Sequence, residues 1–219
     1  MTFKPEIQVC PVCEARFEVP SVRSCGSHGA DSDFRPHCWG YDPLEDQVQA
    51  CRECGFAGYP EDFREGVTEN VIRKIRKFLT PRTRDLKRPS AAFFRYEFLA
   101  LIYEWEDRSS LEVADSFLRA SWVARSRQNR EKERLYQRES VRRFEEALEI
   151  GECGDQSQRA VISYLVGDLH RRLNRRRRAE TWFHRSREEL ALVADSDEGL
   201  AWLSDQIKRQ LESPSDVLV

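Results

Sequence analysis

Two pairs of cysteines with the same short spacing constrain this chain more than any other feature. Cys10 and Cys13 form the first pair, Cys51 and Cys54 form the second, and two residues separate the members of each pair. In a tight turn, that spacing lets both sulfurs reach one metal ion at about 2.3 Å. Four such thiolates fill a tetrahedral shell and leave no position for a catalytic water. The sequence therefore predicts one structural Zn²⁺ bound by these four cysteines.

The segment between the two pairs contains a second set of metal-binding residue types. It is 37 residues long, whereas roughly 15–20 residues is commoner between such pairs, so we expect an insertion that loops out of a zinc ribbon. A second zinc ion could be bound by four residues of this insertion: Cys25, His28, His37 and Cys38. Polar loop residues and surface thiols are the alternative. The adjacent His37 and Cys38 favour that alternative, because neighbours in an extended chain point in opposite directions.

The N-terminal part of the chain is acidic. Residues 1–66 hold six Lys and Arg against twelve Asp and Glu, although the whole chain has a formal net charge of only -2. Four thiolates around one Zn²⁺ would add about two more negative charges. Zinc ribbons often bind nucleic acid, but an acidic surface repels phosphates. The charge therefore disfavours nucleic acid as the partner.

The composition favours a soluble protein. Hydrophobic residues make up 40% of the chain and charged residues 34%, which is typical of a soluble charge-rich protein. The sequence has no apolar run of the roughly 18 residues that a membrane span needs, and its first seven residues contain no apolar signal core. Seven cysteines, four of them at metal spacing, indicate reduced thiols. We expect a cytoplasmic protein that does not contact membranes.

Local patterns divide the chain into an N-terminal part of strands and turns and a C-terminal part of helices. Hydrophobic periodicity and turn residues predict helices near 91–107, 110–128, 131–150, 157–173, 176–193 and 197–211. We expect an α+β, mainly α fold. It would comprise a zinc ribbon (1–60), a connecting helix with a charged linker (61–89), a tetratricopeptide-like helical domain (90–213) and a tail (214–219).

The helical part contains an internal repeat. The tract from Phe98 to Ser121 superposes on a later tract at a shift of 65 residues. The repeated pattern is typical of tetratricopeptide helix pairs, in which small Ala114 and Ala179 let the helices approach while Leu118 and Phe183 fill the groove between them. An unrelated helical bundle with accidental periodicity is the alternative.

Most of the chain resembles an uncharacterised bacterial family, the domain of unknown function numbered 2225. Four N-terminal segments carry the resemblance: Cys10-Pro-Val-Cys13, Asp31-Ser-Asp-Phe-Arg-Pro36, Gly40-Tyr-Asp-Pro-Leu44 and Cys51-Arg-Glu-Cys54-Gly55. The stretch 162–173, followed by Ala179, Trp182 and Phe183, is similar to the helical half of that family. The resemblance implies zinc binding and a tetratricopeptide-like C-terminal part. It implies no reaction.

Arginines cluster at one expected helix–turn–helix, and they have three interpretations. The cluster consists of Arg171, Arg172 and Arg175–Arg178. It could form a solvated turn with ion pairs to acidic helices, or a patch for nucleic acid. Alternatively, Arg171 and Arg172 could bind a carboxylate of a partner peptide. For the acidic turn at Asp31, Asp33 and Phe34, we favour a structural role over a functional patch.

The sequence as a whole favours a non-enzymatic adaptor, in which a structural zinc ribbon precedes helices that bind another protein. The chain contains no phosphate-binding glycine loop, catalytic-triad signature or HExxH motif. Two alternatives stay open. One is a nucleic-acid-binding protein that uses the ribbon or the cluster from Arg171 to Arg178, and the other is an enzyme of an unrecognised type.

Overall fold

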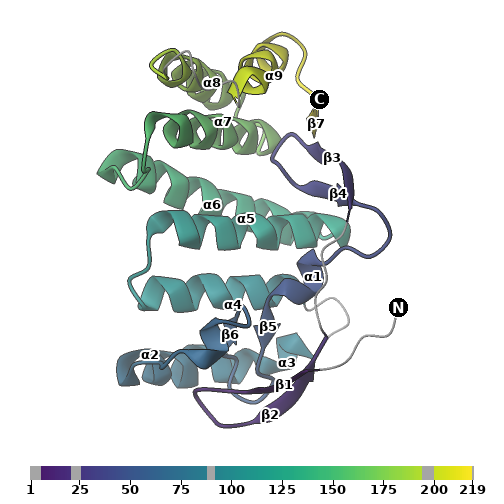
Figure 1. The fold of residues 1–219 in the computed structure, drawn as a ribbon, viewed down its shortest axis with the longest axis vertical. Coiled ribbons are helices and arrows are strands. Elements are labelled where there is room, and N and C mark those ends of the chain that lie inside the picture. The colour runs from purple at the N-terminus through teal and green to yellow at the C-terminus, as the bar shows by residue number, and fades with distance from the viewer. Residues whose placement is uncertain (1–5, 21–25, 88–91, 194–199, 219) are drawn as a thin grey trace.

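The helices stack in one column, and the N-terminal strands lie along one side and at one end of it (Figure 1). The computed structural model describes residues 6–20, 26–87, 92–193 and 200–218. The six predicted helices are confirmed as α4 (Ala92–Trp105), α5 (Ser110–Ser126), α6 (Arg130–Ile150), α7 (Gln156–Arg172), α8 (Arg176–Leu190) and α9 (Ala201–Glu212). The predicted α+β, mainly α fold is therefore confirmed.

Side-chain caps explain why several of these helices begin where they do. Ser109 and Glu112 form a reciprocal capping box at the start of α5. Asn129 accepts a hydrogen bond from a backbone N–H of α6, and Asp155 does the same for α7. Each cap satisfies a backbone donor that has no partner within the helix. At the other end of α6, Gly151 adopts a left-handed conformation that glycine tolerates readily.

The N-terminal part consists of short antiparallel hairpins joined by short helices. Its strands and short helices are β1 (Glu6–Val9), β2 (Arg16–Val19), β3 (Ser27–Asp31), β4 (Pro36–Cys38), α1 (Leu44–Gln47), β5 (Gln49–Ala50), β6 (Ala57–Gly58), η1 (Asp62–Arg64), α2 (Glu69–Lys74), the π-helix η2 (Ile75–Leu79), η3 (Thr80–Arg82) and α3 (Thr83–Leu86). Strand β1 pairs with β2, β3 with β4, and β5 with β6. A late strand, β7 (Val217–Leu218), joins the free edge of β3.

One apolar core continues from the cysteine turns into the helical column. It contains Cys10, Cys51 and Cys54 together with buried side chains of α2, α4, α5, α6 and α7. Polar contacts cross the same boundary, since Tyr103 Oη donates to Asp62 Oδ2 at 2.9 Å. The stretch expected as a charged linker contributes to this packing, because its residues 80–86 form η3 and α3 and bury Leu86.

The two superposing tracts of the sequence form the helix pairs α4/α5 and α7/α8. Ala179 is buried where α8 approaches α7. At the same crossing, a Cβ added to Gly167 would lie 2.8 Å from Cδ1 of Phe183. Glycine therefore allows this close approach without a shift of the Phe183 ring or of the helices. A smaller apolar cluster lies between α7, α8 and α9. Within the described residues, the chain has no helix with the length and apolar character needed to cross a membrane.

Candidate metal centre and the buried polar network

Each cysteine pair lies in a turn with the same backbone hydrogen bonds. In the first turn, Glu14 N–H donates to the carbonyl of Cys10 at 2.9 Å, and in the second Gly55 N–H donates to Cys51, also at 2.9 Å. Glu14 and Gly55 both have positive φ angles, 61° and 87°. This conformation turns the chain back sharply, so both thiols of a pair face the same side. At Gly55 a side chain is also excluded, because its Cβ would lie 2.9 Å from Leu79 Cβ.

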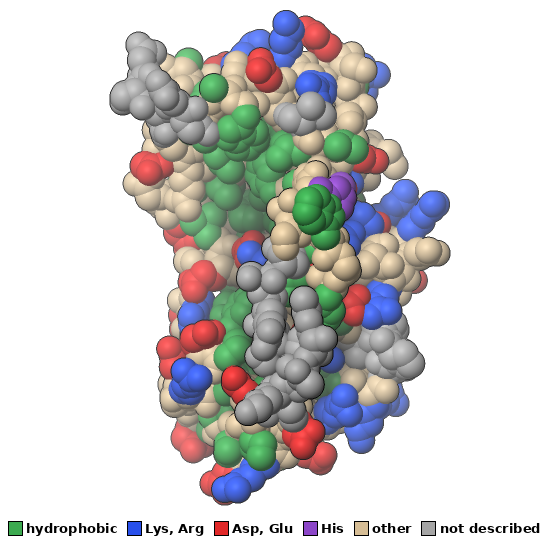
Figure 2. Space-filling model, turned by 45° about the vertical axis from the view of Figure 1, so that its right-hand side comes forward, with side chains coloured by type: hydrophobic (Ala, Val, Ile, Leu, Met, Phe, Trp, Pro, Cys, Tyr) green, Lys and Arg blue, Asp and Glu red, His purple; other side chains and the backbone are tan. Residues whose placement is uncertain are grey.

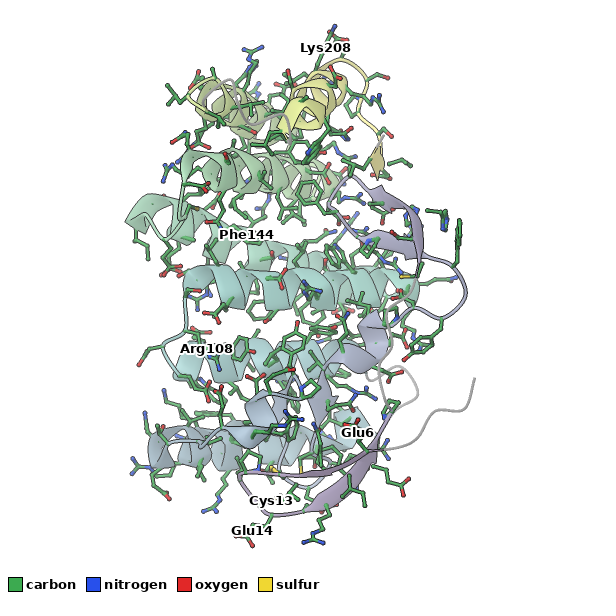
Figure 3. All side chains as sticks on the ribbon, in the orientation of Figure 1. Glu6, Cys13, Glu14, Arg108, Phe144 and Lys208 are labelled. Atoms are coloured by element: carbon green, nitrogen blue, oxygen red, sulfur yellow. The ribbon has the colours of Figure 1, made fainter. Side chains whose placement is uncertain are left out.

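The four thiols form one compact cluster at the lower end of the column, where Figure 3 labels Cys13. All four Sγ atoms lie within 4.8 Å of one another. Cys10 Sγ lies 3.5 Å from Cys54 Sγ, and Cys13 Sγ lies 3.5 Å from Cys51 Sγ. A tetrahedral site with metal–sulfur bonds of about 2.3 Å has edges of about 3.8 Å. The cluster therefore fits a metal ion bound by four thiolates.

The thiols strongly affect one another's protonation. Hydrogen bonding with Cys51 raises the pKa of Cys10 to about 12, whereas the same contact with Cys10 lowers the pKa of Cys51. Hydrogen bonds with Cys10 and Cys51, together with burial, raise the pKa of Cys54. The thiolate form of Cys51 is thus favoured, while the raised pKa values of Cys10 and Cys54 favour their protonated forms. A divalent cation at the centre would supply the charge that lets all four ionise.

The second predicted ligand set does not form a cluster within the part of the chain that the structure describes. Cys25 lies outside the described residues. His37 Nε2 lies 2.7 Å from Asp31 Oδ1, while the ring of His28 stacks on Trp39 at a centroid distance of 5.9 Å. Figure 2 shows histidine side chains at the molecular surface. Cys38 is disulfide-bonded, so its sulfur is not available as a ligand of the predicted second zinc ion.

Arg171 and Arg172, predicted to bind a partner carboxylate, contact carboxylates of their own chain. Their Nε atoms donate to the two oxygens of buried Asp168, each at 2.8 Å. The Nη2 atoms of both arginines also donate to Ser32 Oγ, at 3.1 and 2.8 Å. The two side chains are 19% and 9% exposed. Both guanidinium groups therefore belong to an ion-pair network between α7 and the turn after β3.

The acidic turn at Asp31–Phe34 has the structural role that the sequence favoured. Arg125, at the end of α5, donates to Asp31 Oδ2 and to Asp33 Oδ2, each at 2.5 Å. Phe34 packs against Tyr164 and Trp202. Burial alone would raise the pKa of Asp33, but the hydrogen bond from Arg125 and the charges of Arg172 and Arg125 outweigh burial and lower it. Sequence reasoning missed Arg125, because no local signal links it to this turn.

Arg175–Arg178 form the start of α8, and the last three are exposed. These four arginines line a shallow hollow of about 550 Å³. Arg176 forms an ion pair with Glu180 of the next helical turn at 3.0 Å. The arginines expected from the sequence to form one cluster therefore separate into two groups. Arg171 and Arg172 point into the buried network, whereas the later arginines reach the solvent.

Comparison with known proteins places the chain in one family. The model of a family described as "Uncharacterized protein conserved in bacteria (DUF2225)" matches residues 3–208, a range that includes both cysteine turns and all of α4–α8. No curated protein and no solved structure matches the chain.

Proposed function

The chain belongs to the bacterial DUF2225 family, and we propose that it is a non-enzymatic protein-interaction adaptor stabilised by one structural zinc ion. The observation that carries the metal assignment is the cluster of four Sγ atoms within 4.8 Å. Zinc is the divalent ion most often held by four cysteines in a structural site, and a full thiolate shell leaves no open position for a substrate.

Two observations support the adaptor role. Ion pairs within the chain engage the charged groups of Asp33, Asp168 and Arg172. Charged side chains used in this way stabilise the fold, as we expect in a scaffold protein. In addition, hydrophobic side chains gather in a hollow in the upper half of the face shown in Figure 2. Exposed apolar surface bordered by charged side chains is typical of protein-interaction sites.

Elemental analysis and affinity capture test the two parts of this proposal. We expect about one zinc ion per chain in the purified protein, and no zinc when Cys51 is replaced by Ser. The tagged intact chain, crosslinked in bacterial cells, should capture specific proteins that a Cys51→Ser chain captures less. Absence of bound zinc, or iron in its place, would overturn the metal assignment. Equal recovery by intact chain and tag alone would overturn the adaptor role.

The exposed arginines favour nucleic acid as the second candidate partner. Arg176–Arg178 and the hollow that they line offer positive charge that phosphates could contact. The acidic N-terminal part, with twelve Asp and Glu against six Lys and Arg in residues 1–66, opposes such binding. A ratio of absorbance at 260 and 280 nm typical of nucleic acid, reversed by an Arg177→Glu and Arg178→Glu double substitution, would favour this candidate over the adaptor.

A further inference from the structure

The segment after α9 binds the side of the β3–β4 hairpin as an added strand. Strand β7 pairs antiparallel with β3, with Val217 opposite Asp31 and Leu218 opposite Ala30. One residue earlier, the carbonyl of Asp216 accepts a hydrogen bond from Ser32 N–H at 2.8 Å. Backbone pairing of this kind is how many proteins recognise an extended peptide at a sheet edge.

The acidic side chain of this segment reaches the paired arginines of α7. Asp216 Oδ1 accepts a hydrogen bond from Arg171 Nη2 at 2.7 Å, and its backbone carbonyl accepts one from Arg172 Nη2 at 3.2 Å. The Asp216 side chain is 70% exposed, so it contacts the network from outside. By contrast, Asp168 meets the same arginines from within and is completely buried. The arginines therefore present donors to an incoming carboxylate while an internal carboxylate holds them in place.

A cavity lies next to this segment, between Arg171 and Pro214. Its volume is about 390 Å³. Arg171 and Gln210 contribute polar atoms to its lining, and Ala179, Leu211 and Pro214 contribute apolar ones. Gln210 also binds the segment directly, since its Nε2 donates to the carbonyl of Ser215 at 2.7 Å. An extended segment with a bulkier apolar residue at the position of Pro214 would fill more of this cavity.

The contact area of the segment is small for a permanent strand. β7 has two residues, and Val217 remains 48% exposed. The Asp216 ion pairs face the solvent, where such pairs contribute little to stability. The segment can therefore be displaced at low cost. The arginines beneath it are held by the buried carboxylate of Asp168, and the end of β3 is held by the ion pair between Asp31 and Arg125.

We propose that the β3 edge and the Arg171–Arg172 pair form an acceptor site for an extended partner segment, and that residues 213–218 occupy this site within the chain. The partner segment has an acidic residue followed by two apolar residues, as in Asp216-Val217-Leu218. This inference rests on the proposed adaptor function and names the surface and the kind of partner.

A peptide-binding experiment tests the acceptor site. The probe is a fluorescent peptide with the sequence of residues 213–219, titrated by anisotropy against the zinc-loaded intact chain, a chain that ends at Glu212, and a full-length Asp216→Lys chain. Truncation removes the tethered segment, and Asp216→Lys removes the carboxylate that holds it on the arginines, so either change should expose the site. Both variants should therefore bind the peptide about tenfold or more tightly than the intact chain. A full-length Asp205→Lys chain is the matched control, because Asp205 is exposed on α9 and should leave binding unchanged.

A second peptide separates recognition from nonspecific adhesion. A peptide in which Lys replaces Asp216 should bind the opened chains about tenfold more weakly, because the guanidinium–carboxylate hydrogen bonds are lost. The inference is overturned if folded Asp216→Lys chain does not bind the original peptide, or binds both peptides equally. If the intact chain still captures partner proteins in that case, the adaptor function stands and its surface lies elsewhere.

Discussion

The carboxylate of Asp33, which is completely buried, accepts two hydrogen bonds from the guanidinium group of Arg125, 92 residues later in the chain. This contact joins the insertion between the cysteine turns to the end of α5. Arg172 of α7 approaches the same carboxylate at 3.5 Å. One acidic residue of the insertion thus connects two helices of the column, and the hairpin around it is an integral part of the fold.

Replacing Asp33 by Asn should destabilise the protein considerably. Asn has nearly the same shape but no charge, so Arg125 and Arg172 would lose an anionic partner that is out of reach of water. Removal of one partner from a buried ion pair costs about 3–5 kcal/mol. We expect a loss near the lower end, about 3 kcal/mol, because Asn still accepts a hydrogen bond. Chemical denaturation of the purified protein measures the loss.

Glu139→Gln is the matched control for Asp33→Asn. Glu139 pairs with Arg142 on the exposed surface of α6, and such pairs contribute between about 0 and 1 kcal/mol. A similar small loss for both variants would show that the Asp33 network does not stabilise the fold.

The stability of the protein should fall in acid partly through Asp33. The pKa of Asp33 in the folded protein is lowered from the value of about 3.9 that an aspartate has in an unfolded chain. A lowered pKa contributes stability that is complete above the unfolded value and is lost as pH falls through the folded value. The difference in unfolding free energy between wild type and Asp33→Asn should therefore be constant from pH 7 to 5 and shrink below about pH 4. A difference that is unchanged at pH 3 would contradict this assignment.

Local signals in the sequence predicted much of this structure. The spacing within each cysteine pair requires only a tight turn, and the turns indeed place all four thiols within reach of one ion. Hydrophobic periodicity and turn residues predicted helices that start near 110 and 157, close to the caps at Ser109 and Asp155 in the structure. Each of these features depends on residues close together in the chain, which is why one sequence is sufficient to predict them.

Contacts between distant segments were beyond the reach of such signals. The sequence showed that Arg171 and Arg172 suit a carboxylate, and Asp168 lies only three and four residues before them on α7. It could not show that Asp216, more than 40 residues later, reaches the same two arginines. The pairing of β7 with β3 joins residues almost 190 positions apart, and a two-residue strand has no periodicity to detect. Only the three-dimensional arrangement identifies these partners.

Removal of the proposed zinc ion should loosen α4 before α8. Cys54 and its neighbours share a core with α4, and the Cys54 carbonyl accepts a hydrogen bond from Thr80 Oγ1 at 2.9 Å. By contrast, α8 packs mainly in the separate cluster with α7 and α9. After chelation, hydrogen exchange measured by mass spectrometry should become faster in residues 92–105 and stay slow in 176–190. Equal acceleration in both helices would show that the chain unfolds as one unit, and no change in α4 would show that the cysteine module is independent.

Replacing Gly167 by Ala should test the close approach of α7 and α8. The new methyl group would lie 2.8 and 2.9 Å from Cδ1 and Cε1 of Phe183, so the ring or the helices must move. Overpacking of a core costs about 1–3 kcal/mol, while Ala favours a helix over Gly by about 1 kcal/mol. The two effects together predict a net loss of up to about 2 kcal/mol in the unfolding free energy, measured by denaturant titration.

A double-mutant cycle distinguishes this steric effect from a general intolerance of substitution at Gly167. Phe183→Leu removes the ring atoms that the new methyl group would meet. In this background, Gly167→Ala should therefore be neutral, or should stabilise the protein by up to about 1 kcal/mol because Ala favours the helix. Gly154→Ala is the control for an added methyl group with room, because its nearest neighbour is Gln158 Oε1 at 3.5 Å. The same loss for Gly167→Ala in both backgrounds would mean that contact with Phe183 is not the reason for glycine at this crossing.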